Sequence, residues 1–324
     1  MCLFTRTQEE KKTRNVWGYP ILDTIWEQQF YIPWLQMEKS LPFRAALYGP
    51  DVVDSSITKL LGGKDGKSSI YCIDFTSFDS SVSPTMSMAA FSYIASHFQR
   101  SYIDELRELS HRFINIPIFT PDGEVSGPHG VPSGSSFTNT VDSLVQWLIS
   151  GHNGQKCQIQ GDDGVYVIET RRVETLLNSF REAGLSVNES KSWHFKDRQA
   201  VYLQRYYSER YPNQYGSGLG GVYPIARALN RIKYLERWTD FEKHGIEGRD
   251  FFSLRTIMIL ENCKHHPCFR ELVNYCQSID KHGLKFSDEG VKAYSRMLEP
   301  RVRAGVLQLP QATKHTQHLS LIHI

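Results

Sequence analysis

QIQGDDGVYV, residues 158–167, places two carboxylates side by side in a run that is otherwise apolar and β-prone. One interpretation is a hairpin turn, because Asp-Gly is a strong turn signal and Asp162, Asp163 and Gly164 could bend the chain between two strands. The other interpretation is a metal site, because carboxylate oxygens are hard ligands that suit Mg²⁺. The rest of the chain has to decide between them.

The composition indicates a globular protein. The chain has 324 residues, of which 40% are hydrophobic, and this length suggests about two domains. Lys and Arg number 37 against 35 Asp and Glu, so the net charge of +2 neither requires nor excludes a polyanionic partner. Six cysteines without close CxxC pairs favour a reducing compartment, and no apolar run is long enough to span a membrane. We therefore expect a cytosolic protein.

Two segments are set aside. CKHHPCFRELVNYC, residues 263–276, contains several possible zinc ligands, but their spacing is not a usual zinc pattern and Pro267 favours a joint between two helices. LSLIHI, at residues 319–324, resembles read-through of a sequencing adaptor, so we treat residues 313–324 as artefactual and exclude them from the predicted fold.

The order of the expected elements indicates an α+β fold. A basic extended segment at 11–20 precedes a helix, and a β-prone run at 69–81 precedes a long helix that begins after Ser83 and continues to about residue 110. A Gly/Pro-rich stretch leads into a helix that ends at Gly151, the acidic hairpin follows, and then come a helix ending at Gly184 and short strands. From about residue 224 every segment has a helical pattern.

A second acidic stretch ends a β-prone run in the same way. In IDFTSFD, Asp74 closes the apolar run and Asp79 follows five residues later. If this strand pairs beside the hairpin, Asp74 meets Asp162 and Asp163 at one edge of the sheet, where three carboxylates repel unless cations bridge them. Two ions about 4 Å apart can then support phosphoryl transfer.

DFTSFD (74–79), GVPSGSSFTNTVD (130–142) and GDD (161–163) occur in the order of palm motifs A, B and C and resemble viral RNA-dependent RNA polymerases. The likeness is closest to the partitivirus and picobirnavirus group of double-stranded RNA viruses. KTRNVWGYP resembles motif F of that group, ESKSWHF its motif D, and YLQRYY its motif E, so the likeness spans roughly residues 11–240.

The resemblance implies a right-hand polymerase that joins NTPs on an RNA template by a two-metal mechanism. Its parts would be partial fingers at 1–70, a palm at 71–215 and a helical thumb at 216–312. The implied cofactors are two Mg²⁺ or Mn²⁺ ions. The implied partners are template and nascent RNA, NTPs and a viral capsid protein, without a membrane, in the virion or host cytoplasm.

Site residues are implied motif by motif. Asp74 and Asp162 would be the principal metal ligands, with Asp163 assisting, and Asp79 would face the ribose. Lys191 matches the motif D lysine that protonates the leaving pyrophosphate, although nearby Lys196 competes for this role. The implied nucleotide- and RNA-binding residues are Lys12 and Arg14 for the triphosphate, and Ser133, Gly134, Thr138, Asn139 and Asp142 in motif B.

Motif B carries one substitution that bears on sugar choice. The family usually has Asn four residues after the motif B threonine, whereas this chain has Asp142 there and Asn139 one residue after Thr138. Positions i and i+4 share a helix face, so Asp142 rather than Asn139 should lie beside Thr138 and Asp79. Ionised Asp142 would accept the 2′-OH proton, and two adjacent acids should raise the pKa of one of them or require a basic neighbour.

Two further departures from the family pattern matter. Gly164 stands where the group usually places Ser after GDD, and the long fingers region expected before residue 11 is missing, so the chain looks like a fragment of a larger reading frame. Two other functions stay open. A reverse transcriptase would show a bulky steric gate near Asp79 and a YxDD turn, neither of which is seen, and a non-catalytic RNA-binding remnant would keep the fold without activity.

Overall fold

The computed structural model describes residues 1–7, 13–151, 156–214, 216, 218–235 and 239–303. It has the α+β class that the sequence predicts. The chain divides into two compact units. Unit 1 comprises Met1–Ala46 and Lys59–Leu203, and unit 2 comprises Leu47–Thr58 and Gln204–Ile324. The predicted boundaries of fingers, palm and thumb stay predictions. No helix in the described ranges is long and apolar enough to cross a membrane.

A four-stranded sheet in the order β6-β7-β3-β8 carries the two acidic stretches of unit 1. β3 (Ser68–Ile73) is buried along its whole length and pairs antiparallel with β7 (Asp163–Glu169), with Ile73 opposite Gly164. β7 also pairs with β6 (Cys157–Gln160), and β8 (Trp193–Phe195) pairs with β3. The predicted pairing of the first acidic strand beside the hairpin is confirmed.

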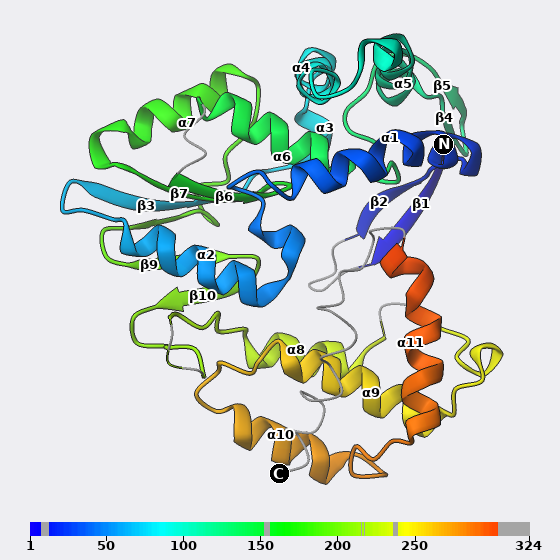
Figure 1. Cartoon of the computed structure of the whole chain (residues 1–324), viewed down its shortest axis with the longest axis vertical. Coiled ribbons are helices and arrows are strands. Elements are labelled where there is room, and N and C mark those ends of the chain that lie inside the picture. Colours follow the sequence, from blue (N-terminus) through cyan, green and yellow to red (C-terminus); the bar gives the residue numbers. More distant parts are fainter. Residues whose placement is uncertain (8–12, 152–155, 215, 217, 236–238, 304–324) are drawn as a thin grey trace. The chain divides into compact units, whose positions relative to one another are not determined.

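Helices α6 (Thr138–Ile149) and α7 (Val173–Glu182) lie on the same side of this sheet (Figure 1). Their apolar residues join those of the strands in one hydrophobic core, to which α1 (Ile21–Glu38), α4 (Pro84–Ala95) and α5 (Ile103–Asn115) also contribute. Gly151 and Gly184 follow α6 and α7 with positive φ angles, which confirms the predicted helix ends.

The predicted long helix after Ser83 is interrupted. Its start is confirmed, because Ser83 Oγ accepts a hydrogen bond from the Met86 N–H and Pro84 is the first residue of α4. The helix ends at Ala95, and a short 3₁₀ turn, η3 (Arg100–Tyr102), precedes α5. Ser96 Oγ donates to the carbonyl of Tyr93. Such local side-chain bonds compete with helical ones. The apolar periodicity does not record this competition, so it predicted one helix where the structure has two.

A second sheet of unit 1, in the order β2-β1-β4-β5, contains the basic strand of the sequence. β1 (Cys2–Thr7) pairs antiparallel with β2 (Thr13–Gly18), which confirms that this segment is extended. The other two strands are β4 (Ile118–Thr120) and β5 (Gly123–Val125), and β9 (Gln199–Tyr202) and the four-residue helix α3 (Phe78–Ser81) complete the unit.

Unit 2 is mainly helical, as the sequence predicts from about residue 224 onward. Buried residues of α8, α9 and α10 form one hydrophobic cluster, and a second cluster joins α9 to α11. Cys263 and Cys276 belong to the first cluster as free thiols. The elements are β10 (Arg205–Ser208), α8 (Ile225–Lys233), α9 (Gly248–Glu261), α10 (Phe269–Ile279) and α11 (Asp288–Arg303), with α2 (Pro50–Gly62) beginning in this unit.

Candidate active site

The GDD stretch forms the tip of the β6-β7 hairpin. Gln160 pairs with Asp163, so Gly161 and Asp162 are the two loop residues, and Gly161 has the left-handed φ of 66° that such a tight turn requires. The turn thus lies one residue earlier than the Asp-Gly interpretation placed it, because Asp163 and Gly164 already belong to β7. The hairpin and the acidic site are one structure, and the two interpretations do not compete.

Strand register brings Asp74 to this tip. Ile73 is opposite Gly164, so Asp74, the next residue, leaves β3 where Asp163 begins β7. Burial, followed by the negative charges of Asp162 and Asp74, raises the pKa of Asp163 to about 7. Asp162 is exposed, whereas Asp74 and Asp163 are half-buried. The predicted meeting of three acids at one edge is therefore supported by the register and by the charges that act on Asp163.

The motif A turn packs against the entry to motif B. The Val131 N–H donates to the carbonyl of Asp79 at 2.7 Å, and a Cβ added at Gly130 would lie 2.2 Å from the same oxygen. A side chain at position 130 would therefore push the two segments apart. The side chain of Asp79 is exposed at the start of α3.

The motif B loop is held in place by α1 and β2. The Trp17 N–H donates to Ser133 Oγ, and a Cβ at Gly134 would lie 2.4 Å from the Trp17 carbonyl. Glu27, which is 1% exposed, accepts from Ser135 Oγ at 2.6 Å and from the Ser136 N–H at 2.7 Å. The motif B loop is thus anchored on two sides.

Thr138 and Asp142 lie one turn apart on α6, as predicted. The Thr138 hydroxyl donates to the carbonyls of Pro132 and Ser135 and so closes the loop onto its own helix. Asp142 is 4% exposed, and its Oδ1 has no hydrogen-bond partner among the described residues. Burial, then the charges of Asp79 and Asp162, raise the pKa of Asp142 well above its usual value. A raised pKa for one of two adjacent acids is what the sequence led us to expect.

Arg44 is the largest feature of the site that the sequence did not indicate. It is 1% exposed and forms an ion pair of 2.9 Å with Glu38, which is fully buried. Its guanidinium also donates to side chains of α6 and to β6. The acceptors are Ser143 Oγ, Asn139 Oδ1 at 2.7 Å, the Ile159 carbonyl at 3.1 Å and Gln160 Oε1 at 2.8 Å. One buried cation therefore ties motif B to motif C.

Asn139 consequently has a structural role that its predicted position, turned away from the ribose, did not suggest. Its Oδ1 accepts from Arg44, and a Cβ placed at Gly161 would lie 3.1 Å from its Nδ2. For the buried Arg44, the only signal in the sequence was its place within the apolar run LPFRAALY, residues 41–48. Arginines at the protein surface also occur in such runs, so the pattern does not predict burial.

The predicted basic residues are placed less fully. Lys12 lies outside the described residues, and Arg14 is in β2, where only its backbone is described. Lys191 and Lys196 are both exposed, on either side of β8. Their roles toward a triphosphate or a leaving group stay predictions.

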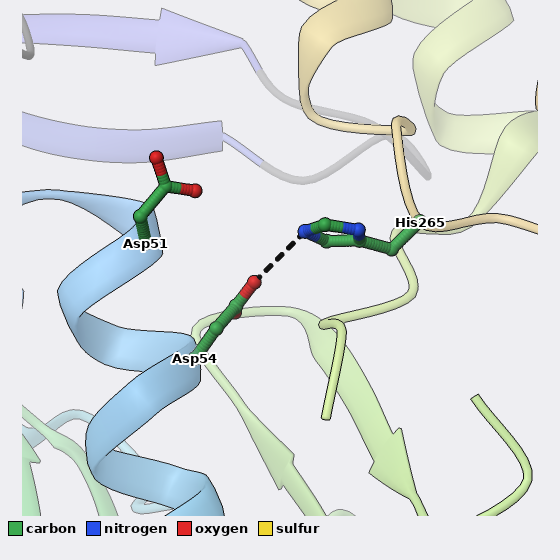
Figure 2. Close-up of side chains that lie close together, drawn as sticks. All are labelled: Asp51, Asp54 and His265. Carbon is green, nitrogen blue, oxygen red and sulfur yellow. Dashed lines mark ion pairs between the residues drawn. The ribbon is translucent and has the colours of Figure 1, made fainter. Parts of the chain in front are cut away.

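A separate cluster in unit 2 has the composition of a metal site. Figure 2 shows Asp51 and Asp54 on α2 and His265 from the loop after α9, and one ligand atom of each lies within 4.8 Å of the others. However, His265 Nδ1 accepts from the Gln214 N–H, so Nε2 carries the proton and faces Asp54 Oδ2 at 3.1 Å. Asp51 pairs with Lys264 at 2.6 Å. A metal on Nε2 would require an imidazolate and would compete with a lysine, so we interpret the cluster as a polar network that contains the Asp51–Lys264 ion pair.

Comparison with known proteins agrees with the motifs and the fold. The chain is 29% identical over 318 residues to a potential RNA-dependent RNA polymerase of human picobirnavirus (strain Human/Thailand/Hy005102/-), covering 95% of this chain and 58% of that protein. It is 27% identical over 247 residues to an RNA-directed RNA polymerase of Cryptosporidium parvum virus 1 (strain KSU-1), covering 70% and 44%. The crystal structure of a human picobirnavirus RNA-dependent RNA polymerase matches with a TM-score of 0.81 and 28% identity, over 94% of this chain and 60% of that one.

The chain thus spans about three fifths or less of the length of these relatives. The family model of viral RNA-dependent RNA polymerases matches residues 5–220, which include all the motifs from F to E. The resemblance inferred from the sequence is confirmed, and the chain belongs to the viral RNA-dependent RNA polymerase family.

Proposed function

We propose that the parent protein, by which we mean the longest open reading frame containing this chain, extends RNA on an RNA template from NTPs. The observation that carries the proposal is the convergence of Asp74, Asp162 and Asp163 at one end of the β3-β7-β6 sheet, next to the motif B helix. Residues 1–70 would be part of the fingers, 71–215 the palm and 216–312 the thumb.

The three carboxylates fit divalent cations. Burial, and after it the negative charges of Asp162 and Asp74, raise the pKa of Asp163, and a bound cation would relieve the repulsion among the three. Asp74 and Asp162 would hold the ions, with Asp163 assisting. When bound, Mg²⁺ or Mn²⁺ supplies Lewis-acid stabilisation of negative charge on the reacting oxygens.

Asp79 and Asp142 would select the sugar of the incoming nucleotide. The two carboxyl groups are close enough to interact: after burial, the charge of Asp79 is the largest cause of the raised pKa of Asp142. A neutral carboxyl can donate as well as accept a hydrogen bond. Asp142 can therefore serve the 2′-OH as donor or acceptor, which extends the acceptor role expected from the sequence.

The remaining residues would bind the nucleotide and the leaving group. Lys12 and Arg14 would contact the triphosphate, and Lys191 would protonate the pyrophosphate. Ser133 and Gly134 lie in an anchored loop before α6, where exposed backbone groups can meet template or nucleotide. A capsid-protein contact and a virion or cytoplasmic location stay predictions.

Extension of a primed RNA template by the purified parent protein tests the proposal. We expect NTP incorporation that requires Mg²⁺ or Mn²⁺, follows the template and stops when the cation is chelated. RNA binding without incorporation would instead indicate a non-catalytic remnant, and preferential incorporation of dNTPs on RNA would indicate a reverse transcriptase. Asp51→Asn changes an acid of the separate unit 2 cluster, so this variant should incorporate NTPs as the wild type does.

A further inference from the structure

Gln146 on α6 contacts the acidic turn from behind. The side chain is fully buried, and its Nε2 donates to the main-chain carbonyl of Asp162 at 3.0 Å. Its Oε1 accepts from the hydroxyl of Tyr166 at 3.0 Å, and Tyr166 is itself 1% exposed. Both ends of the amide are thus occupied, and the Asp162 carbonyl, which can only accept, fixes which end faces the turn.

A second residue of α6 contacts the same turn. Ser143, one helical turn before Gln146, accepts the N–H of Gly161 on its Oγ at 2.7 Å. The two loop residues of the hairpin are therefore fastened to one helix face, Gly161 through its N–H and Asp162 through its carbonyl. Because the Asp162 side chain starts from this backbone, the two bonds fix where its carboxylate can lie.

Gly164 is required by the same side chain. A Cβ added at position 164 would lie 2.2 Å from Gln146 Oε1, and only 3.0 Å from atoms of Ile73 and Tyr166. A side chain at 164 can therefore be accommodated only if Gln146 moves away. The serine that the family usually places after GDD is incompatible with the position that Gln146 occupies here.

We propose that Gln146 is a positioning residue for the catalytic turn, and that Gln146 and Gly164 form a matched pair in which the position of Gln146 requires glycine at 164. This inference rests on the proposed polymerase function. Gln146 acts through the backbone of Asp162 and not on the substrate. Losing its amide leaves the Asp162 carbonyl without this donor, so the turn gains freedom and the metal-binding carboxylate is displaced.

Gln146→Met tests the amide with little change in volume. Misplacement of a reacting group by about 1 Å can cost about 100-fold in rate, so we expect kcat to fall at least about 10-fold while KM for NTP stays nearly constant. Hydrogen exchange in the peptide covering residues 158–167 should become faster. Wild-type kcat with unchanged exchange would overturn the proposal.

Gln158→Met is the matched control. Gln158 is also a buried amide with two hydrogen bonds, from the Ala45 N–H and to the Pro42 carbonyl, and it lies on β6 away from the turn. Gln158→Met should lower the melting temperature about as much as Gln146→Met does, but it should leave kcat near that of the wild type. An equal loss of kcat in both variants would show that Gln146 is only a structural residue.

Gly164→Ser, alone and combined with Gln146→Ala, tests the matched pair. In the wild-type background Gly164→Ser should reduce kcat at least as strongly as Gln146→Ala. In the Gln146→Ala background it should cause a smaller further loss, because the nearest atom, Gln146 Oε1, is gone and only the 3.0 Å contacts with Ile73 and Tyr166 remain. Losses that multiply would show that the two positions act independently.

These outcomes separate the inference from the function on which it rests. If the wild-type parent protein does not extend RNA, the proposed function fails, and the exchange measurement still tests whether Gln146 holds the turn. If the wild type extends RNA and Gln146→Met does so equally well with unchanged exchange, only the positioning role of Gln146 fails.

Discussion

Replacing Arg44 with Met should be among the most destabilising single changes in unit 1. The change removes a buried cation and leaves Glu38, which is fully buried, without its ion-pair partner. Breaking a buried pair from one side costs about 3–5 kcal/mol, a large part of a total stability of about 5–15 kcal/mol. We expect a loss in this range in the free energy of unfolding, measured by urea denaturation at pH 8 and low temperature.

Substitution of Glu38, the ion-pair partner of Arg44, tests the pair, because the sign of its effect on stability should differ between the wild type and Arg44→Met. Glu38→Gln should destabilise the wild type, because it leaves Arg44 unpaired, but it should stabilise Arg44→Met, because it removes the uncompensated carboxylate. Arg107→Met is the matched surface control, since the Arg107–Asp104 pair is 72% and 91% exposed and such pairs contribute about 0–1 kcal/mol. A loss for Arg44→Met no larger than that of the control would refute the structural role of Arg44, as would Glu38→Gln destabilising both backgrounds.

Two further predictions concern other acids of the site. Asp142→Ala should lower the preference for NTP over dNTP by about 5- to 150-fold, because a lost 2′-OH hydrogen bond is worth about 1–3 kcal/mol. Asp142→Asn should largely keep the preference. Steady-state incorporation of both substrates measures the preference, and an unchanged value in Asp142→Ala would contradict the prediction. The pKa of Glu27 is raised, chiefly by burial, so its stabilising contribution is complete below the unfolded pKa and is lost as the pH rises through the folded one. The melting temperature of the wild type relative to Glu27→Gln should therefore fall as the pH rises above the ordinary carboxyl pKa of 4.5, and a constant difference would contradict this assignment.

The acidic edge was predictable because its signals are local. Asp74 and the GDD pair each follow or interrupt a β-prone run, and once β3 pairs with β7 the two runs must bring their acids together. The helix ends at Gly151 and Gly184 were also predictable from the sequence, because the residue after a helix often has a positive φ, which glycine adopts most easily. Even the turn error was small: Asp-Gly signals a hairpin, but the strand pairing of Gln160 with Asp163 fixes the bend at Gly161 and Asp162.

The support behind that edge could not be predicted in the same way. Arg44 contacts Ser143, which lies 99 residues away, and Glu27 contacts Ser135, which lies 108 residues away. Periodicity reports which face of a helix is buried, and it does not report which distant residue a buried polar group meets. Gln146 and Gly164 illustrate this limit, because the sequence marks Gly164 only as a departure from the family pattern and its relation to Gln146 appears only when α6 lies against β7.

The rate of single-nucleotide addition by Asp162→Ala in the parent protein tests the central claim most directly. Loss of a metal ligand removes several kcal/mol of transition-state stabilisation, so the rate should fall at least about 100-fold while primed RNA is still bound. Asp51→Ala, which removes an acid of the unit 2 polar network, should keep the wild-type rate. Addition at near the wild-type rate by Asp162→Ala would show that Asp162 is only a turn residue and that the acidic edge is not the catalytic site.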